Sequence, residues 1–75
     1  MRDVGSIIVP VLNEGDNIET LLIPLQRLRQ RGWCIVVVDG GSTDDTLHKA
    51  KPLVNKVITS PPGRARQMNA GAVEA

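Results

Sequence analysis

Aromatic residues are almost missing from this chain of 75 residues, which has one tryptophan and neither tyrosine nor phenylalanine. Proteins that hold single-stranded nucleic acid stack its bases on several aromatic side chains, so that kind of platform is excluded. Charge agrees with this, because nine Lys and Arg against eight Asp and Glu leave a formal net charge of only +1. A nucleic-acid-binding domain usually carries a basic excess. We therefore expect no nucleic-acid partner.

Cysteine and histidine are equally scarce, with one of each. Cys34 has no second cysteine for a disulfide or a CxxC site, and His48 has no Cys or His at ligand spacing. A reducing, cytoplasmic setting is the default expectation. The start lacks the pattern of an export signal, and no stretch approaches the ~20 apolar residues that cross a bilayer. Association with a membrane, peripheral to it, is expected only through regions outside these residues.

Three short apolar runs predict buried strands. Residues 6–11 and 33–38 are rich in Ile and Val and almost uniformly apolar, which is typical of strands covered on both faces. Residues 56–60 form the third. Strands alternate with helical segments, and the connections are long enough for right-handed crossovers. The predicted class is α/β, a Rossmann-like parallel sheet in the order β-α-β-α-β-α, with residues 1–75 as a single partial domain.

The helical segments show start signals and apolar spacing. Asp16 and Glu19 form a predicted capping box for a helix that ends at Gly32, and Pro24 predicts a kink or break near residues 20–23. Ser42 or Thr43 is the predicted N-cap of a short second helix.

A third helix follows the rigid turn at residues 61–63 and covers residues 64–74. Its spacing places Ala65, Met68 and Ala72 on one side.

Ligands of open parallel sheets bind at the carboxyl ends of the strands. That rule directs attention to the loops at residues 10–16, 39–44 and 60–66. Asp39 ends a buried strand beside two glycines, where its carboxylate can accept hydrogen bonds from a base nitrogen or a ribose hydroxyl. The alternative is structural, with Asp39 capping only its own turn.

The first and third of these loops add a carboxylate and cations to the same edge. Asn13 and Glu14 form a polar turn after the first strand, and by itself this pattern favours an ordinary structural turn. Arg64 and Arg66 stand at a helix start, where they oppose the helix dipole unless an anion lies nearby. A bound diphosphate explains that placement, and solvated surface arginines are the alternative. Neither GxGxxG nor a P-loop is present.

Three blocks of the sequence together resemble the opening of family 2 glycosyltransferases of the GT-A fold. They are SIIVPVLNE at residues 6–14, IVVVDGGSTDDT at residues 35–46, and GRARQMNAGA at residues 63–72. All three fit in order and spacing, and the third looks most like a bacterial subgroup of the family. The resemblance covers nearly the whole chain and implies that it is the nucleotide-binding part of a GT-A domain.

The resemblance also implies a binding site for a nucleotide diphosphate sugar, with UDP or GDP as the nucleotide. Pro10 is expected to border the base, Glu14 to contact base or ribose, and Asp39 to bond the base. Arg64 is expected to approach the diphosphate, and Asp44 mainly to hold its loop. The implied substrate-binding residues are Pro10, Asn13, Glu14, Asp39, Gly41, Ser42 and Arg64.

Catalysis needs parts that the sequence does not contain. Family members use Mg²⁺ or Mn²⁺ held by a DxD-type motif after the next strand, and a carboxylate base for the acceptor hydroxyl. No catalytic or metal-binding residue is therefore assigned here, and these 75 residues alone are expected to be inactive. The complete protein is expected to be an inverting glycosyltransferase.

The resemblance also implies that the chain associates with copies of itself. Two other interpretations of the sequence stay open. The first strand is expected to expose an unpaired edge, which favours self-association. A noncatalytic receiver-like module with Asp39 as its acidic centre is one alternative, and the GGSTDDT loop argues against it. A nucleotidyltransferase of related fold is the other, and Asn13 with Glu14 stands where its Gly-rich basic loop would lie.

Overall fold

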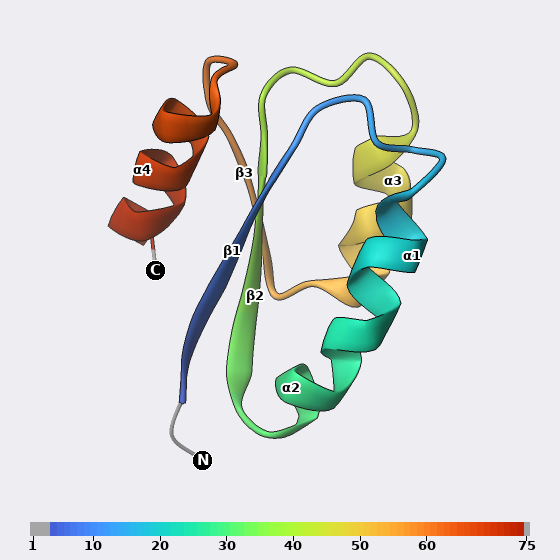
Figure 1. The fold of residues 1–75 in the computed structure, drawn as a ribbon, viewed down its shortest axis with the longest axis vertical. Helices are drawn as coiled ribbons and strands as arrows, with labels where there is room; N and C mark the ends of the chain where they lie inside the picture. The colour runs from blue at the N-terminus through green and yellow to red at the C-terminus, as the bar shows by residue number, and fades with distance from the viewer. Residues whose placement is uncertain (1–3, 75) are drawn as a thin grey trace.

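The computed structural model describes residues 4–74 as a parallel sheet between two helical layers (Figure 1). Its strands are β1 (Gly5–Val11), β2 (Trp33–Asp39) and β3 (Lys56–Thr59), in that spatial order, so β2 is central. Both pairings are parallel. The predicted α/β class with a Rossmann-like sheet is confirmed, and each strand bound lies within one residue of its predicted position.

The helices divide between the two faces of the sheet (Figure 1). One face is covered by α1 (Ile18–Leu22), the 3-10 turn η1 (Ile23–Leu25), α2 (Gln26–Gln30), α3 (Thr46–Ala50) and the 3-10 turn η2 (Lys51–Leu53). The other face is covered by α4 (Arg64–Glu74). All of β2 from Ile35 onward is buried, as expected for a strand with helices on both sides.

Alternation along the strands assigns their side chains to the two layers. Ile35 and Val37 join the main hydrophobic core with Ile18 and Leu22, all of them fully or almost fully buried. Val38 faces the opposite way, toward α4. Both faces of the central strand are therefore shielded from solvent from Ile35 onward.

Pro24 breaks the first helical segment, as predicted. The chain passes from α1 into a 3-10 turn with Pro24 near its start and then into α2. Pro24 has no backbone N–H for the carbonyl one turn earlier, so a continuous α-helix would lose a hydrogen bond there. Within α1, Leu22 is fully buried whereas its neighbour Leu21 is 47% exposed.

Two predicted helix caps are wrong. The helix α1 begins at Ile18, and neither the side chain of Asp16 nor that of the actual N-cap Asn17 accepts a capping hydrogen bond from the first turn. The backbone carbonyl of Glu14 instead accepts the N–H groups of Asn17 and Ile18 at 2.9 and 2.7 Å. The helix α3 begins at Thr46, beyond Ser42 and Thr43. Those two side chains contact another loop, because polar partners far along the sequence compete with local capping.

The apolar side of α4 is not the side that packs on the sheet. Gln67 and Gly71, one turn apart, are the buried residues of this helix, whereas Met68 is 39% exposed. The spacing rule favoured apolar residues, but close packing on the sheet selects a glycine: a Cβ at Gly71 would lie 2.5 Å from Ile8 Cγ2. None of the helices within residues 4–74 has the length and apolar character needed to span a membrane.

Candidate functional site

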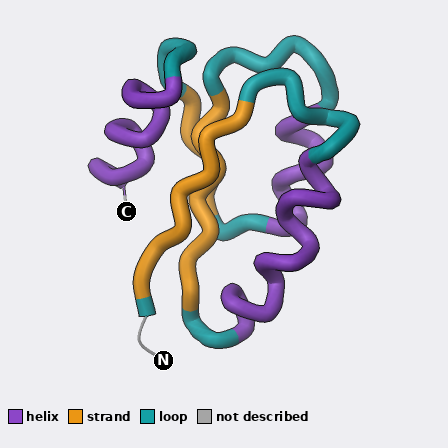
Figure 2. The backbone as a smooth tube through the Cα atoms, viewed as in Figure 1, coloured by secondary structure: helices purple, strands orange, loops and turns teal. Residues whose placement is uncertain are grey.

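The two loops that follow β1 and β2 lie side by side at the carboxyl edge of the sheet, at the top of Figure 2. The turn that enters α4 lies at the same end of the sheet. This is the edge at which parallel sheets bind ligands. The sequence-predicted loops are thus brought together by the topology.

Asp39 holds its own loop closed. Its carboxylate accepts the backbone N–H groups of Gly41 and Ser42 at 3.1 and 2.9 Å, and the Ser42 hydroxyl donates to the other oxygen. The residue is only 2% exposed. Gly41 has a φ of +103°, a backbone region that favours glycine, and this explains the residue type in the turn. The structural role that sequence analysis left open for Asp39 is therefore real.

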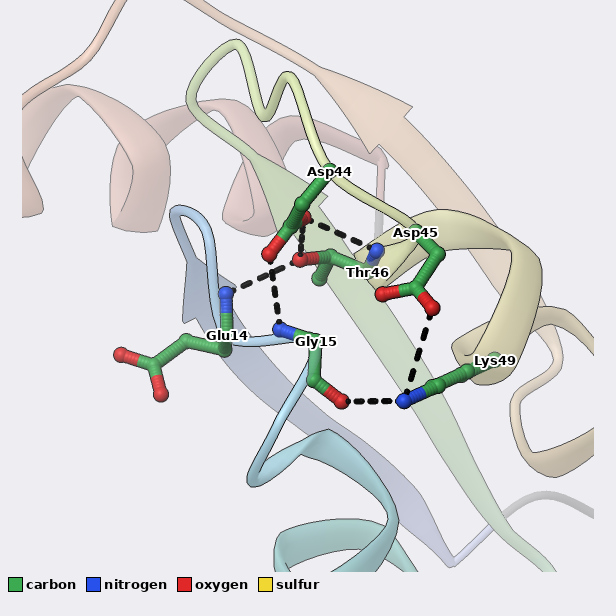
Figure 3. Close-up of polar contacts among 6 residues, drawn as sticks. All are labelled: Glu14, Gly15, Asp44, Asp45, Thr46 and Lys49. Atoms are coloured by element: carbon green, nitrogen blue, oxygen red, sulfur yellow. Dashed lines mark hydrogen bonds and ion pairs between the residues drawn. The ribbon is translucent and has the colours of Figure 1, made fainter.

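The polar turn after β1 is bound by side chains of the second loop. Three consecutive backbone N–H groups donate across: Asn13 to Ser42 Oγ at 2.8 Å, Glu14 to Thr46 Oγ1 at 2.9 Å, and Gly15 to Asp44 Oδ2 at 3.1 Å. Figure 3 shows the contacts of Glu14 and Gly15. Every amide of this turn thus finds a partner about 30 residues away.

Asn13 also accepts a hydrogen bond from the second loop, so the two loops are bonded to each other in both directions. Its backbone is left-handed, with a φ of 50°, which asparagine tolerates better than most residues. Its side-chain oxygen accepts the backbone N–H of Thr43 at 2.8 Å. The two loops consequently form one unit, with donors and acceptors on both sides.

The Asp44 carboxylate accepts hydrogen bonds from both loops of this unit, from Gly15 and from Thr46 (Figure 3). Hydrogen bonds from the Thr46 hydroxyl, followed by the backbone N–H groups of Thr46 and Gly15, lower the pKa of its carboxyl group below the usual 3.8, although partial desolvation opposes the shift. Lys49 adds a cation nearby, with Nζ 2.9 Å from the Gly15 carbonyl and 3.5 Å from an Asp45 oxygen. The expectation that Asp44 holds the loop agrees with these contacts.

Acid should weaken this unit. The folded pKa of Asp44 lies below the unfolded value, so its contribution to stability is complete above about pH 4 and is lost as the pH falls through the folded pKa. We expect Asp44→Asn to remove part of the loss of unfolding free energy that occurs as the pH falls below about 4. Urea denaturation of both proteins at several pH values measures this difference. An identical pH dependence for both proteins would contradict it.

A pocket of about 380 Å³ opens beside these loops, along the end of β1. Its apolar wall comes from the strand end and α1, and its polar groups are Glu14, Arg64 and Gln67. Figure 3 shows the Glu14 carboxylate directed away from the Asp44 and Thr46 contacts. Its backbone is therefore fixed in the loop unit while its carboxylate remains outside the bonds drawn there. The lining residues are Val9, Pro10, Val11, Leu12, Glu14, Leu21, Arg64 and Gln67.

The structure divides the seven predicted site residues into two groups. Pro10, Glu14 and Arg64 line the pocket. The other four build the loop unit behind it: Asn13, Asp39, Gly41 and Ser42. Direct contact of any of them with a nucleotide stays a prediction.

Sequence reasoning missed two residues of this region. Thr46 is fully buried and joins Asp44 to Glu14, and Gln67 is 5% exposed and lines the pocket. Gln67 follows Arg64 by three residues, so the two share a helix face. That spacing was the available signal, but a glutamine on a helix usually points to solvent.

The described residues do not fit a Mg²⁺ or Mn²⁺ centre. Between Val4 and Glu74, no group of three or more His, Cys, Asp or Glu side chains could hold a metal ion. The oxygens of Asp39 and Asp44 already accept hydrogen bonds from the loops.

Comparison with known proteins adds the family. Neither a curated protein nor a solved structure matches the chain. The family model described as glycosyl transferase family 2 matches residues 6–75, a span that includes both cross-linked loops, the pocket-lining residues and α4. The chain therefore belongs to glycosyl transferase family 2.

Proposed function

We propose that the pocket at the end of β1 binds the nucleotide part of a nucleotide diphosphate sugar, UDP- or GDP-linked, for transfer of the sugar to a hydroxyl acceptor. Family membership supports glycosyl transfer in general. The observation that carries the proposal is the pocket itself, which is lined by an apolar wall together with an acidic residue, Glu14, and a basic one, Arg64.

Each part of the pocket suits one part of such a donor. The wall around Pro10 offers apolar surface to a base, and Glu14 can accept a hydrogen bond from a base N–H or a ribose hydroxyl. Arg64 stands in the first turn of α4, where both its charge and the free backbone N–H groups favour a diphosphate. This anion accounts for a cation placed against the helix dipole.

In this proposal the loop unit does not contact most of the ligand but fixes the turn that carries Glu14. Asp39 uses three of the roughly four acceptor positions of a carboxylate on Gly41 and Ser42. One position is left for the predicted bond to a base. The surroundings of Asp39 favour an indirect role for this residue, in which its loop contacts hold Glu14 in place.

Two further parts of the proposal concern the complete enzyme. We place the ligands of its Mg²⁺ or Mn²⁺ and its catalytic base outside residues 4–74, and we expect an inverting reaction. The cytoplasm is the proposed location, because Cys34 is a free thiol.

Calorimetric titration with UDP tests the proposal. Wild-type protein should bind UDP, and Arg64→Ala should weaken binding about tenfold or more, because a hydrogen bond to a charged group contributes about 1.5–3 kcal/mol. The matched control is Arg66→Ala: Arg66 is also exposed, stands two residues away and does not line the pocket. A folded wild-type sample that binds neither UDP nor GDP would refute the proposal and favour a noncatalytic module.

Self-association is a second expectation for these residues. Within the described part of the chain, β1 pairs only with β2, so its outer edge carries unpaired backbone groups. We expect a dimer or larger species that grows with concentration. Size-exclusion chromatography with light scattering measures the mass, and a monomer at high concentration would contradict the expectation.

A further inference from the structure

We infer that Gln67 is a positioning residue of the nucleotide pocket, whose carboxamide sets the place of Arg64 against the ends of β1 and β2. The inference rests on the proposed function, in which Arg64 binds the diphosphate. It assigns a role to a buried polar side chain that sequence reasoning did not identify.

Both hydrogens of the Gln67 carboxamide are used on the sheet. Nε2 donates to the Val11 carbonyl at 2.9 Å and to the Val38 carbonyl at 2.8 Å. These carbonyls belong to neighbouring strands near their carboxyl ends. Because the side chain is only 5% exposed, water cannot readily replace either bond. One side chain of α4 therefore ties the helix to both strands beside the pocket.

The same side chain also secures the start of α4. Gln67 Oε1 accepts the backbone N–H of Gly63 at 3.3 Å, while the backbone N–H of Gln67 donates to the Gly63 carbonyl at 2.9 Å. This reciprocal pair encloses the first turn of the helix, which carries Arg64. Arg64 and Gln67 lie three residues apart and line the same pocket. A shift of the carboxamide would therefore move the guanidinium.

Gly40 shows how closely the carboxamide is held. A Cβ at this position would lie 2.9 Å from Gln67 Oε1 and 3.0 Å from its Cδ. Gly40 is not among the residues with positive φ, so its backbone does not demand glycine. The space taken by Gln67 explains the residue type. Gly40 therefore leaves room for the Gln67 side chain of α4, whereas Gly41 provides the positive φ that the turn requires.

Gln67 has no free donor for a ligand, so it acts through Arg64. A positioning role predicts a loss confined to the part of the ligand that Arg64 contacts. Binding of UDP should suffer, while binding of uridine, which has no phosphate, should not. A side chain that merely stabilises the fold would affect both ligands equally.

The test is calorimetric titration of Gln67→Met with UDP and with uridine. Met keeps the length of the side chain and removes both donors, and the Val11 carbonyl still accepts the Gly40 N–H at 3.0 Å. We expect UDP affinity to fall about tenfold and uridine affinity to change less than about twofold. The control is Gln26→Met, because Gln26 Nε2 likewise donates to two carbonyls, of Leu22 and Leu53, and lies outside the pocket. Its ratio of UDP to uridine affinity should equal that of the wild type.

The outcomes distinguish failure of the positioning role from failure of the proposed function on which it rests. If Arg64→Ala weakens UDP binding but Gln67→Met keeps the wild-type ratio, the positioning role is refuted and the proposed function stands. If folded wild-type protein binds neither UDP nor GDP, both are refuted. Should Gln67→Met fail to fold, Gly40→Ala keeps the carboxamide and crowds it, and the same ratio must fall there. In the Arg64→Ala background, Gln67→Met should cause almost no further loss of UDP affinity.

Discussion

Asp39→Ala is expected to abolish detectable binding of UDP. The substitution removes the acceptor for two backbone N–H groups and for the Ser42 hydroxyl, and Ser42 in turn holds Asn13. Because these donors are part-buried, leaving them without a partner should cost about 1 kcal/mol or more, so the loop should open and Glu14 should lose its place beside the pocket. Titration calorimetry with UDP, together with thermal unfolding, measures both effects.

The matched control for this prediction is Asp45→Ala. Asp45 lies in the same loop region, but its side chain is 57% exposed and forms only an ion pair with Lys49. Exposed pairs of this kind contribute about 0–1 kcal/mol, so binding should change little. Wild-type affinity in Asp39→Ala would refute the role of Asp39. Loss of affinity in both variants would show that the loop as a whole, and not Asp39, is the sensitive element.

Leu22→Ala should cause the largest loss of stability. Leu22 is fully buried in the core between the sheet and the first helical layer. Truncation of a buried leucine costs about 2–5 kcal/mol, and a small domain has only about 5–15 kcal/mol in total. We expect a strongly lowered unfolding midpoint in urea.

Its neighbour provides the control for stability. Leu21 is 47% exposed, so Leu21→Ala should change the unfolding free energy by less than about 0.5 kcal/mol. Because Leu21 lines the pocket, its effect on nucleotide binding is a separate matter. Equal destabilisation by the two alanine substitutions would mean that the core is not arranged as described.

Buried polar side chains perform opposite tasks at the carboxyl edge of the sheet. Asp39 accepts from donors of its own loop, and Gln67 donates to carbonyls of two strands. Where a sheet ends, its backbone groups lose their ladder partners and must find others. Within the described residues, no buried side-chain nitrogen or oxygen lacks a partner. This complete pairing is consistent with a rigid binding edge.

The strands and the helix break could be predicted because their causes are local. A β-branched apolar run such as that of β2 has a strong preference for a buried strand wherever it occurs, and Pro24 lacks its N–H in any context. The caps failed for the opposite reason. The side chains of Ser42 and Thr43 have good local capping chemistry, but Asn13 in the turn after β1 competes for them.

By itself, the sequence determined the α/β class, the three loops at one edge and the family blocks, because periodicity, turn residues and motif spacing are written along the chain. Only the tertiary structure decided which of those residues face a pocket. Asp39 turned inward to its loop, whereas Glu14 and Arg64, about 50 residues apart, came to line one cavity. It also decided that Gln67 and Gly71, not Met68, form the inner side of α4. Such choices depend on close packing and on distant hydrogen-bond partners, and neither is visible in local sequence.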